Sequence, residues 1–304
     1  MTKVLTFIST HIINNAVVSE YKKMTTVKGY DCILAIDNTN LKIKTKERIS
    51  EQTFFGTKIK CFFFDSDLQK ELQLPWFSYD KETKKFSDIM WYNSDYRFYY
   101  IKKYFPNYDY YWQFEYDIFC NGKTYQYFFD KYKKQTEDCL CLQFRKEKLN
   151  GKWFWSKSIK WIYGDSQIYA AFFPIVRLSN KAIELLYNKR LEHKKLYKNI
   201  TNKEKNHWPF CEVFLPTEII KSKLSVFKLN EDKITYEDEY DLNESRLFEH
   251  PDNLLYHPVK GNFIERENKL KKRINELEGK KENKISHIKQ LIKKVLKIKK
   301  SKSY

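Results

Sequence analysis

Two carboxylates follow a strongly apolar segment near the middle of the chain. The run from Tyr110 to Phe114 (YYWQF) predicts a buried strand, and Glu115 and Asp117 come directly after it, with Gly122 placed to allow a tight turn. Carboxylates are the hard oxygen ligands that Mg²⁺ and Mn²⁺ prefer, and a cation held there would neutralise a bound diphosphate. The segment therefore favours a metal and diphosphate site, although an ordinary strand end with solvated acids has the same pattern.

Other predicted strands end in a similar way. Three apolar runs toward the N-terminus predict strands at Val4–Ser9, Tyr30–Ile36 and Ile59–Phe64. Asp37 follows the second run, and Asp65 and Asp67 follow the third. Strands that alternate with helices or loops predict an α/β fold with an open sheet, and ligands of such sheets bind beyond the carboxyl ends of the strands.

The remaining segments predict helices and further strands. A helix-like stretch lies between residues 93 and 104, with Ser94 or Asp95 as its N-cap, and residues 123–146 predict a helix followed by a strand. Trp153–Tyr163 predicts one or two strands, and Leu178–Lys195 predicts an amphipathic helix capped by Ser179. His207–Leu215 is a compact aromatic segment.

Composition bounds the class of protein. Aromatic residues make up 17% of the 304 residues, which supplies enough buried ring area for a folded chain. The six cysteines include no C-x-x-C pair and lie mostly in apolar surroundings, which favours free thiols in a reducing compartment. No apolar stretch approaches the ~20 residues of a membrane span, and the N-terminus does not resemble a signal peptide. We therefore expect a cytoplasmic protein.

Positive charge is concentrated at the C-terminus. The net charge of the chain is +18, and residues 260–304 hold 16 Lys and Arg against 5 Glu, an excess of 11 positive charges. Apolar residues at a spacing of three to four predict a helical tail over 261–304, behind a domain of residues 1–260. Such a tail could pack on its own domain, form a coiled-coil contact, or dock on the anionic inner face of the cytoplasmic membrane.

Three segments together carry a resemblance to a known family. The run from Trp112 to Gly122 has the form W-x-x-E-Y-D-x-x-x-x-G, Phe172–Ser179 has the form F-F-P-x-x-R-x-S, and His257–Lys260 reads H-P-V-K. In order and spacing they resemble bacterial glycosyltransferases of the nucleotide-diphospho-sugar (GT-A) type, which build lipopolysaccharide, capsule and related surface glycans. The resemblance implies a GT-A fold, a nucleotide-sugar donor, a glycan or glycolipid acceptor and a divalent cation, Mn²⁺ or Mg²⁺.

The same resemblance implies roles for particular residues. Asp117 would be a metal ligand, Glu115 a direct or water-mediated one, and His257 a late ligand from a C-terminal loop. The donor-binding residues would be Asp37, Asp95, Arg97 and Lys260. Each also has an ordinary structural explanation, such as a turn, a helix cap, an ion pair or a solvated side chain.

An inverting transferase also needs a base for the acceptor hydroxyl. Glu212, in an aromatic segment that would raise the pKa of a carboxylate, is the candidate, and Asp165 is the second candidate. A buried ion pair or a helix cap would explain either residue equally well, and a retaining enzyme would need no base in that place.

Two other classes of function remain open. Asp65 or Asp67 with Glu82 and Lys84 imitates the acid…E-x-K metal site of a restriction-type nuclease, but the segment around Glu82 is polar and loop-like. A non-catalytic module docked on a membrane by the tail is the other alternative. We expect no nucleic-acid partner, because the positive charge lies mainly in the tail.

Overall fold

The structure is a computed structural model that describes residues 2–45, 47–65, 67–75, 90–147, 153–164, 167–197, 208–235 and 252–259. The strands are β1 Val4–Thr10, β2 Tyr30–Asp37, β3 Ile49–Phe54, β4 Thr57–Phe64, β5 Tyr110–Glu115, β6 Phe119–Cys120, β7 Cys139–Glu147, β8 Ile168–Ser179, β9 Val226–Leu229 and β10 Leu255–Tyr256. The helices are α1 Asn15–Thr25, α2 Asp67–Leu72, α4 Tyr96–Tyr104, α5 Gln126–Tyr132, the 3₁₀ helix η1 Phe154–Ile159, α6 Lys160–Tyr163, α7 Asn180–Tyr197 and α8 Cys211–Lys221.

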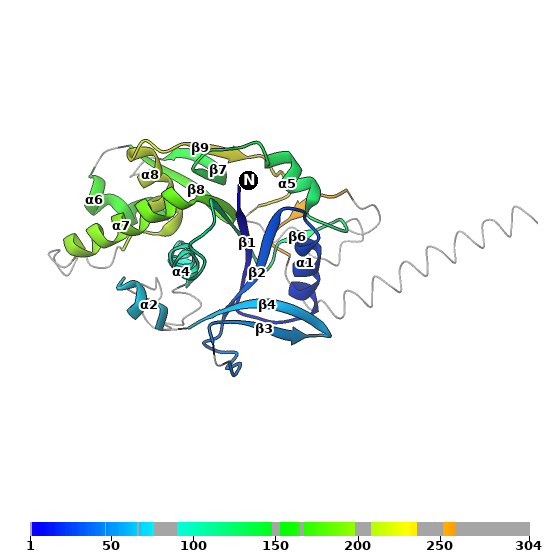
Figure 1. Cartoon of the computed structure of the whole chain (residues 1–304). Helices are drawn as coiled ribbons and strands as arrows, with labels where there is room; N and C mark the ends of the chain where they lie inside the picture. The colour runs from blue at the N-terminus through cyan, green and yellow to red at the C-terminus, as the bar shows by residue number, and fades with distance from the viewer. Residues whose placement is uncertain are drawn as a thin grey trace, which may run out of the picture.

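Eight of these strands form one sheet, in the order β3-β4-β2-β1-β5-β8-β7-β9. Strands β4, β2, β1 and β5 run parallel to one another, whereas β3 is antiparallel to β4 and β8 is antiparallel to both β5 and β7. Helices lie on both sides of this sheet (Figure 1). The prediction of an α/β fold with a mixed open sheet flanked by helices is confirmed.

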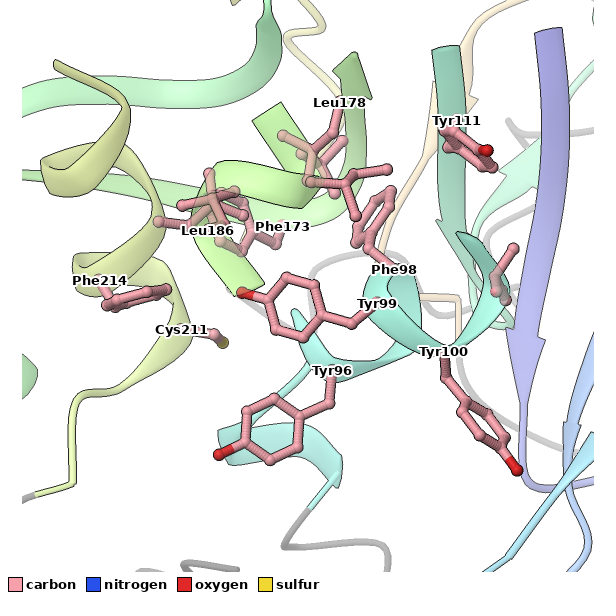
Figure 2. Close-up of a cluster of buried hydrophobic side chains, with 14 of the residues drawn as sticks. Tyr96, Phe98, Tyr99, Tyr100, Tyr111, Phe173, Leu178, Leu186, Cys211 and Phe214 are labelled. Carbon is pink, nitrogen blue, oxygen red and sulfur yellow. The ribbon is translucent and has the colours of Figure 1, made fainter. Parts of the chain in front are cut away.

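The two faces of the sheet have separate cores. Successive residues of a strand point to opposite faces, so Phe7 packs in a cluster with α4, α7 and α8, whereas Ile8 packs in another with α1 and α5. Figure 2 shows the aromatic side chains of α4 in the first core, between Tyr111 of β5 and Phe214 of α8. This packing fixes α4, and with it Arg97, near the carboxyl ends of the parallel strands.

Several sequence predictions fail or shift at this level. The strand predicted at Trp153–Tyr163 is wrong, because η1 and α6 occupy it. The hydroxyls of Ser156 and Ser158 each donate to the carbonyl oxygen three residues earlier, which favours a helical turn over an extended strand.

The predicted helix starts are partly confirmed. Ser179 caps α7 as predicted, because its Oγ accepts a hydrogen bond from the amide of Ala182 at 3.0 Å. Asp95 precedes α4 but makes no side-chain cap. Among the described residues no helix is long and apolar enough to cross a membrane. The predicted tail at 261–304 lies outside the described residues.

Candidate functional site

A cavity of about 590 Å³ opens at the carboxyl ends of the parallel strands. Strand β1 is paired with β2 on one side and β5 on the other, so the chain winds away in both directions from this position. Open α/β sheets bind ligands at such a switch point. The last residues of four strands line the cavity: Thr10 of β1, Asp37 of β2, Phe64 of β4 and Glu115 of β5.

Glu115, Asp117 and His257 meet at one side of this cavity. The Nε2 atom of His257 lies 3.7 Å from Oε2 of Glu115 and 3.5 Å from Oδ1 of Asp117. One ligand atom from each residue lies within 4.8 Å of the others. Two carboxylates and an imidazole form a donor set that suits Mn²⁺ or Mg²⁺. The residues predicted as metal ligands are therefore brought together.

A small two-stranded sheet brings His257 to the carboxylates. Strand β10 pairs antiparallel with β6, and the amide of Val259 donates to the carbonyl oxygen of Asp117 at 2.9 Å. Gly122 favours this approach, because a Cβ at that position would lie 2.5 Å from Oδ1 and 3.3 Å from Cα of Asn253 and would force Asn253 to shift. The glycine predicted to form a turn thus also leaves room for the segment that carries His257.

The ring of His257 is held in a defined orientation. Its Nδ1 lies 3.0 Å from the carbonyl oxygen of Thr235 and must donate to it, because a carbonyl only accepts. Nε2 then faces the two carboxylates, as in metal sites where a partner fixes the tautomer of a histidine ligand. Burial lowers the pKa of His257, but Glu115 and Asp117 outweigh it and raise the pKa above its ordinary value. A cation and a proton would therefore compete for this position.

Asp37 and Arg97 both line the same cavity. Burial raises the pKa of Asp37, against the opposing effects of the hydrogen bond from Thr39 and the charge of Arg97. Burial also lowers the pKa of Arg97, which feels the carboxylates of Glu115 and Asp37. The Nε atom of Arg97 is buried without a hydrogen-bond partner among the described residues. Asp37 and Arg97 are thus two of the four predicted donor-binding residues, and both line the cavity.

Asp95 has a different role from the one predicted. Both of its carboxylate oxygens accept from the buried guanidinium of Arg190, at 2.8 and 3.0 Å, and Tyr99 donates a further bond at 2.6 Å. Asp95 is 1% exposed and is not among the described residues that line the cavity. The structure therefore places Asp95 in an internal ion pair rather than on the wall of the cavity.

Glu212 lies on the cavity wall, in the first turn of α8. It is 9% exposed, and its Oε1 accepts a hydrogen bond from the amide of Phe173 at 3.1 Å. The other two predicted residues, Asp165 and Lys260, lie outside the described residues. Of the two predicted bases, Glu212 therefore lies in the same cavity as Glu115, Asp117 and His257.

Sequence reasoning missed one ionisable side chain of the cavity. His11 follows β1, and its ring contacts that of Tyr116 edge-on at 4.7 Å. Burial lowers the pKa of His11, with Arg97 acting in the same direction and Asp37 and Glu115 opposing. The signal was its place just beyond a predicted strand, two residues after Ser9, much as Asp37 and Glu115 follow theirs.

The aromatic side chains of the cavity were also missed. Trp91, Trp153, Trp155 and Phe210 come from three separate segments of the chain. Their high local density was visible in the sequence, but nothing there indicated that they share one wall.

Comparisons with known proteins find only distant likenesses. No family model and no curated protein matches this chain. Solved structures that match include mouse xyloside xylosyltransferase 1, with 12% identity, a TM-score of 0.42, and coverage of 86% of this chain and 97% of that one. A glycosyltransferase involved in glycosylation of the major capsid of PBCV-1 matches with 8% identity, a TM-score of 0.37, and coverage of 88% and 98%.

The galactosyltransferase LgtC, in complex with donor and acceptor sugar analogues, matches with 9% identity, a TM-score of 0.40, and coverage of 86% and 87%. Likenesses this distant do not establish an activity for this chain.

Proposed function

We propose that this protein is a metal-assisted glycosyltransferase, which moves a sugar from a nucleotide-diphosphate donor to a glycan or glycolipid acceptor. The observation that carries the proposal is the meeting of Glu115, Asp117 and His257 within 4.8 Å at the switch point of the sheet. The cavity beside them, of about 590 Å³, has room for a ligand of this size.

Glu115, Asp117 and His257 would hold a divalent cation. When bound there, Mn²⁺ or Mg²⁺ would neutralise the charge that builds up on the departing nucleoside diphosphate. In the part of the chain that the structure describes, four carboxylates line the cavity (Asp37, Glu115, Asp117 and Glu212), and Arg97 provides a fixed positive charge among them. An anionic diphosphate would be repelled by this surface, so a cation between the ligand and the carboxylates resolves the conflict.

The chain's own residues would bind the donor and activate the acceptor. The unpartnered Nε of Arg97 supplies a hydrogen-bond donor for an anionic or hydroxyl group of the ligand. Asp37, at the end of β2, would accept from the ribose or the base. Lys260 is proposed from the sequence as a partner for a diphosphate oxygen. Glu212 would accept the proton of the acceptor hydroxyl as that oxygen attacks the anomeric carbon, with Asp165 as the sequence-based second candidate.

A turnover screen tests the proposal. Uridine, guanosine and thymidine diphosphate sugars would each be incubated with the protein, Mn²⁺ or Mg²⁺, and a mixture of simple glycoside acceptors. We expect release of the nucleoside diphosphate from at least one donor, and its loss on addition of EDTA. If no donor is turned over with either cation, or if EDTA has no effect, the proposal of a metal-assisted transferase is wrong.

Two finer parts of the proposal rest on the sequence. The resemblance to surface-glycan enzymes supports an acceptor in bacterial surface polysaccharide synthesis. The 11 excess positive charges of residues 260–304 support docking of the tail on an anionic membrane. A lipid-linked acceptor would lie at that surface, which gives the two parts one rationale.

The nuclease alternative receives less support. Asp65 pairs with Arg48 at 3.8 Å, and Glu82 and Lys84, which would complete the acid…E-x-K site, lie outside the described residues.

A further inference from the structure

One wall of the cavity is built from aromatic rings. Trp155 and Phe210 are stacked, with ring centroids 4.7 Å apart, and Trp91 contacts both, at 5.4 Å from Trp155 and 5.2 Å from Phe210. We call these three rings the aromatic wall. All three residues line the cavity, and Trp91 remains 48% exposed. A large apolar ring that stays exposed inside a cavity suggests a surface for a ligand.

The aromatic wall is fixed in place by neighbouring polar groups. The amide of Phe210 donates to Oγ of Ser158 at 3.0 Å, which ties the start of α8 to η1. Cys211 donates its thiol to the carbonyl oxygen of Trp91 at 3.8 Å, and Ser94 in turn donates to the Cys211 sulfur at 3.1 Å. The rings are therefore held before any ligand arrives, and binding would require little further ordering.

A carboxylate lies directly beside this wall. Glu212 comes two residues after Phe210 and lines the same cavity. The amide of Phe173 donates a hydrogen bond to Glu212, and the neighbouring Phe172 ring contacts that of His257, with centroids 5.4 Å apart. A chain of contacts thus leads from the aromatic wall through Glu212, Phe173 and Phe172 to His257, one of the three candidate metal ligands.

We propose that the aromatic wall binds a pyranose ring of the acceptor, with Trp91 as the principal stacking surface; this inference rests on the proposed function. A pyranose has an apolar face of C–H groups and an edge of hydroxyls. The partly positive C–H face suits the negative face of an indole ring. With that face on Trp91, the hydroxyl edge would be left free to meet Glu212, which lines the same cavity and needs a hydroxyl to deprotonate. An aliphatic acceptor would use only the aromatic wall, and a polyphosphate acceptor would not stack on it.

Ligand binding can be measured without turnover. Methyl glycosides of glucose, galactose, N-acetylglucosamine and rhamnose would be titrated into the full-length protein and followed by saturation-transfer NMR and tryptophan fluorescence. Trp91→Ala, Trp91→Phe and Tyr127→Ala would be compared with the parent protein. Tyr127 is a matched control, because it is an aromatic residue that is 57% exposed on α5, which packs on the opposite face of the sheet.

We expect at least one glycoside to bind. Trp91→Ala should raise the Kd of that glycoside about 10-fold, which is the effect of one good aromatic contact. Trp91→Phe should retain part of the affinity, and Tyr127→Ala should retain all of it. If no glycoside binds, or if Trp91→Ala binds as tightly as the parent, the inference is wrong. Trp91→Ala that loses affinity for a nucleoside diphosphate instead would assign the wall to the base of the donor and also overturn it.

These outcomes separate the two proposals. If the protein turns over a nucleotide sugar and Trp91→Ala leaves the acceptor KM unchanged, the transferase proposal is supported and the proposal that the aromatic wall binds the acceptor is wrong. Binding of a glycoside through Trp91, with no nucleotide sugar turned over, would leave a carbohydrate-binding wall in a protein that is not a transferase.

Discussion

His257 and Asp117 lie far apart in the chain, yet Nε2 of the histidine approaches Oδ1 of the aspartate to 3.5 Å. The contact depends on the pairing of β10 with β6 and on the bond from Val259 to the Asp117 carbonyl. It joins the middle of the sheet to the last described segment of the chain. A cation bound between these residues would therefore link metal affinity to the stability of that segment.

We predict that Asp117→Asn weakens Mn²⁺ binding and abolishes turnover. Loss of an outer partner of a metal ligand already costs about 10- to 100-fold in affinity, so removal of a charged ligand should cost at least that much. Titration of Mn²⁺ by electron paramagnetic resonance gives the Kd directly. Asp130→Asn is the control, because Asp130 is a surface carboxylate paired with Lys133. Equal Mn²⁺ affinity in the parent and Asp117→Asn would remove Asp117 from the metal site.

We predict that Glu212→Gln lowers kcat by about 10²- to 10⁴-fold, the contribution of a general base. Glutamine keeps the shape of the side chain and its acceptor oxygen for the Phe173 amide, so the donor Kd should change little. Steady-state kinetics and donor titration would be measured on the same preparation. A variant with the parent kcat would show that Glu212 is not the base, and Asp165 would then be tested.

We predict that Asp95→Asn destabilises the protein by about 3–5 kcal/mol, because it leaves the buried guanidinium of Arg190 without its countercharge. Urea unfolding measures the change. Glu192→Ala, which removes the exposed pair with Lys189 at 2.7 Å, should cost only about 0–1 kcal/mol. Unchanged stability of Asp95→Asn together with weaker donor binding would instead restore Asp95 to the donor site.

We predict a pH-dependent stability that is due to Glu218. Burial raises the pKa of Glu218 from 4.5 to about 7, with Lys221 opposing. Between pH 4.5 and 7 the folded state holds this proton and the unfolded state does not, so the contribution of Glu218 to the free energy of unfolding falls as pH rises through this window. His193, whose pKa is lowered, contributes in the opposite direction below its ordinary pKa of 6.5. The full loss is on the order of 3 kcal/mol, from about 1.4 kcal/mol per pKa unit.

Glu218→Gln isolates this effect, since glutamine does not titrate. The nearby His193, 3.1 Å from Glu218, has its pKa lowered to about 3 by burial, then by Arg190 and Lys189, so in the folded state it stays neutral across the window. The stability advantage of the parent over the variant should therefore shrink from pH 4.5 to 7. A difference that stays constant with pH would contradict the raised pKa.

We predict that the tail binds anionic vesicles in a salt-sensitive manner. Each basic residue near such a surface contributes about 1 kcal/mol. Full-length protein would be sedimented with phosphatidylserine-containing and neutral vesicles at low and high salt, beside a variant with the tail lysines from Lys289 to Lys302 replaced by glutamine. If the fraction of protein that sediments does not depend on lipid charge, or is equal for the two proteins, a tail that packs on its own domain or on a partner is favoured instead.

The sequence by itself determined the local features of this protein. Apolar runs followed by Asp37, Glu115 and Asp117 indicated strands with acids at their carboxyl ends, because strand periodicity and the position of a strand end are local properties. The cap of α7 at Ser179 was predictable for the same reason. From these features followed the α/β class and the candidate metal ligands Glu115 and Asp117, whereas His257 followed from the family resemblance.

Only the tertiary structure decided which residues share a cavity. The sequence could not separate Asp95 from Arg97, two residues apart, although α4 turns the first toward Arg190 and the second toward Glu115 and Asp37. It also could not unite Trp91, Trp155 and Phe210, because long-range packing brings the three segments together. Packing between distant segments depends on all of them at once, and no local pattern records it.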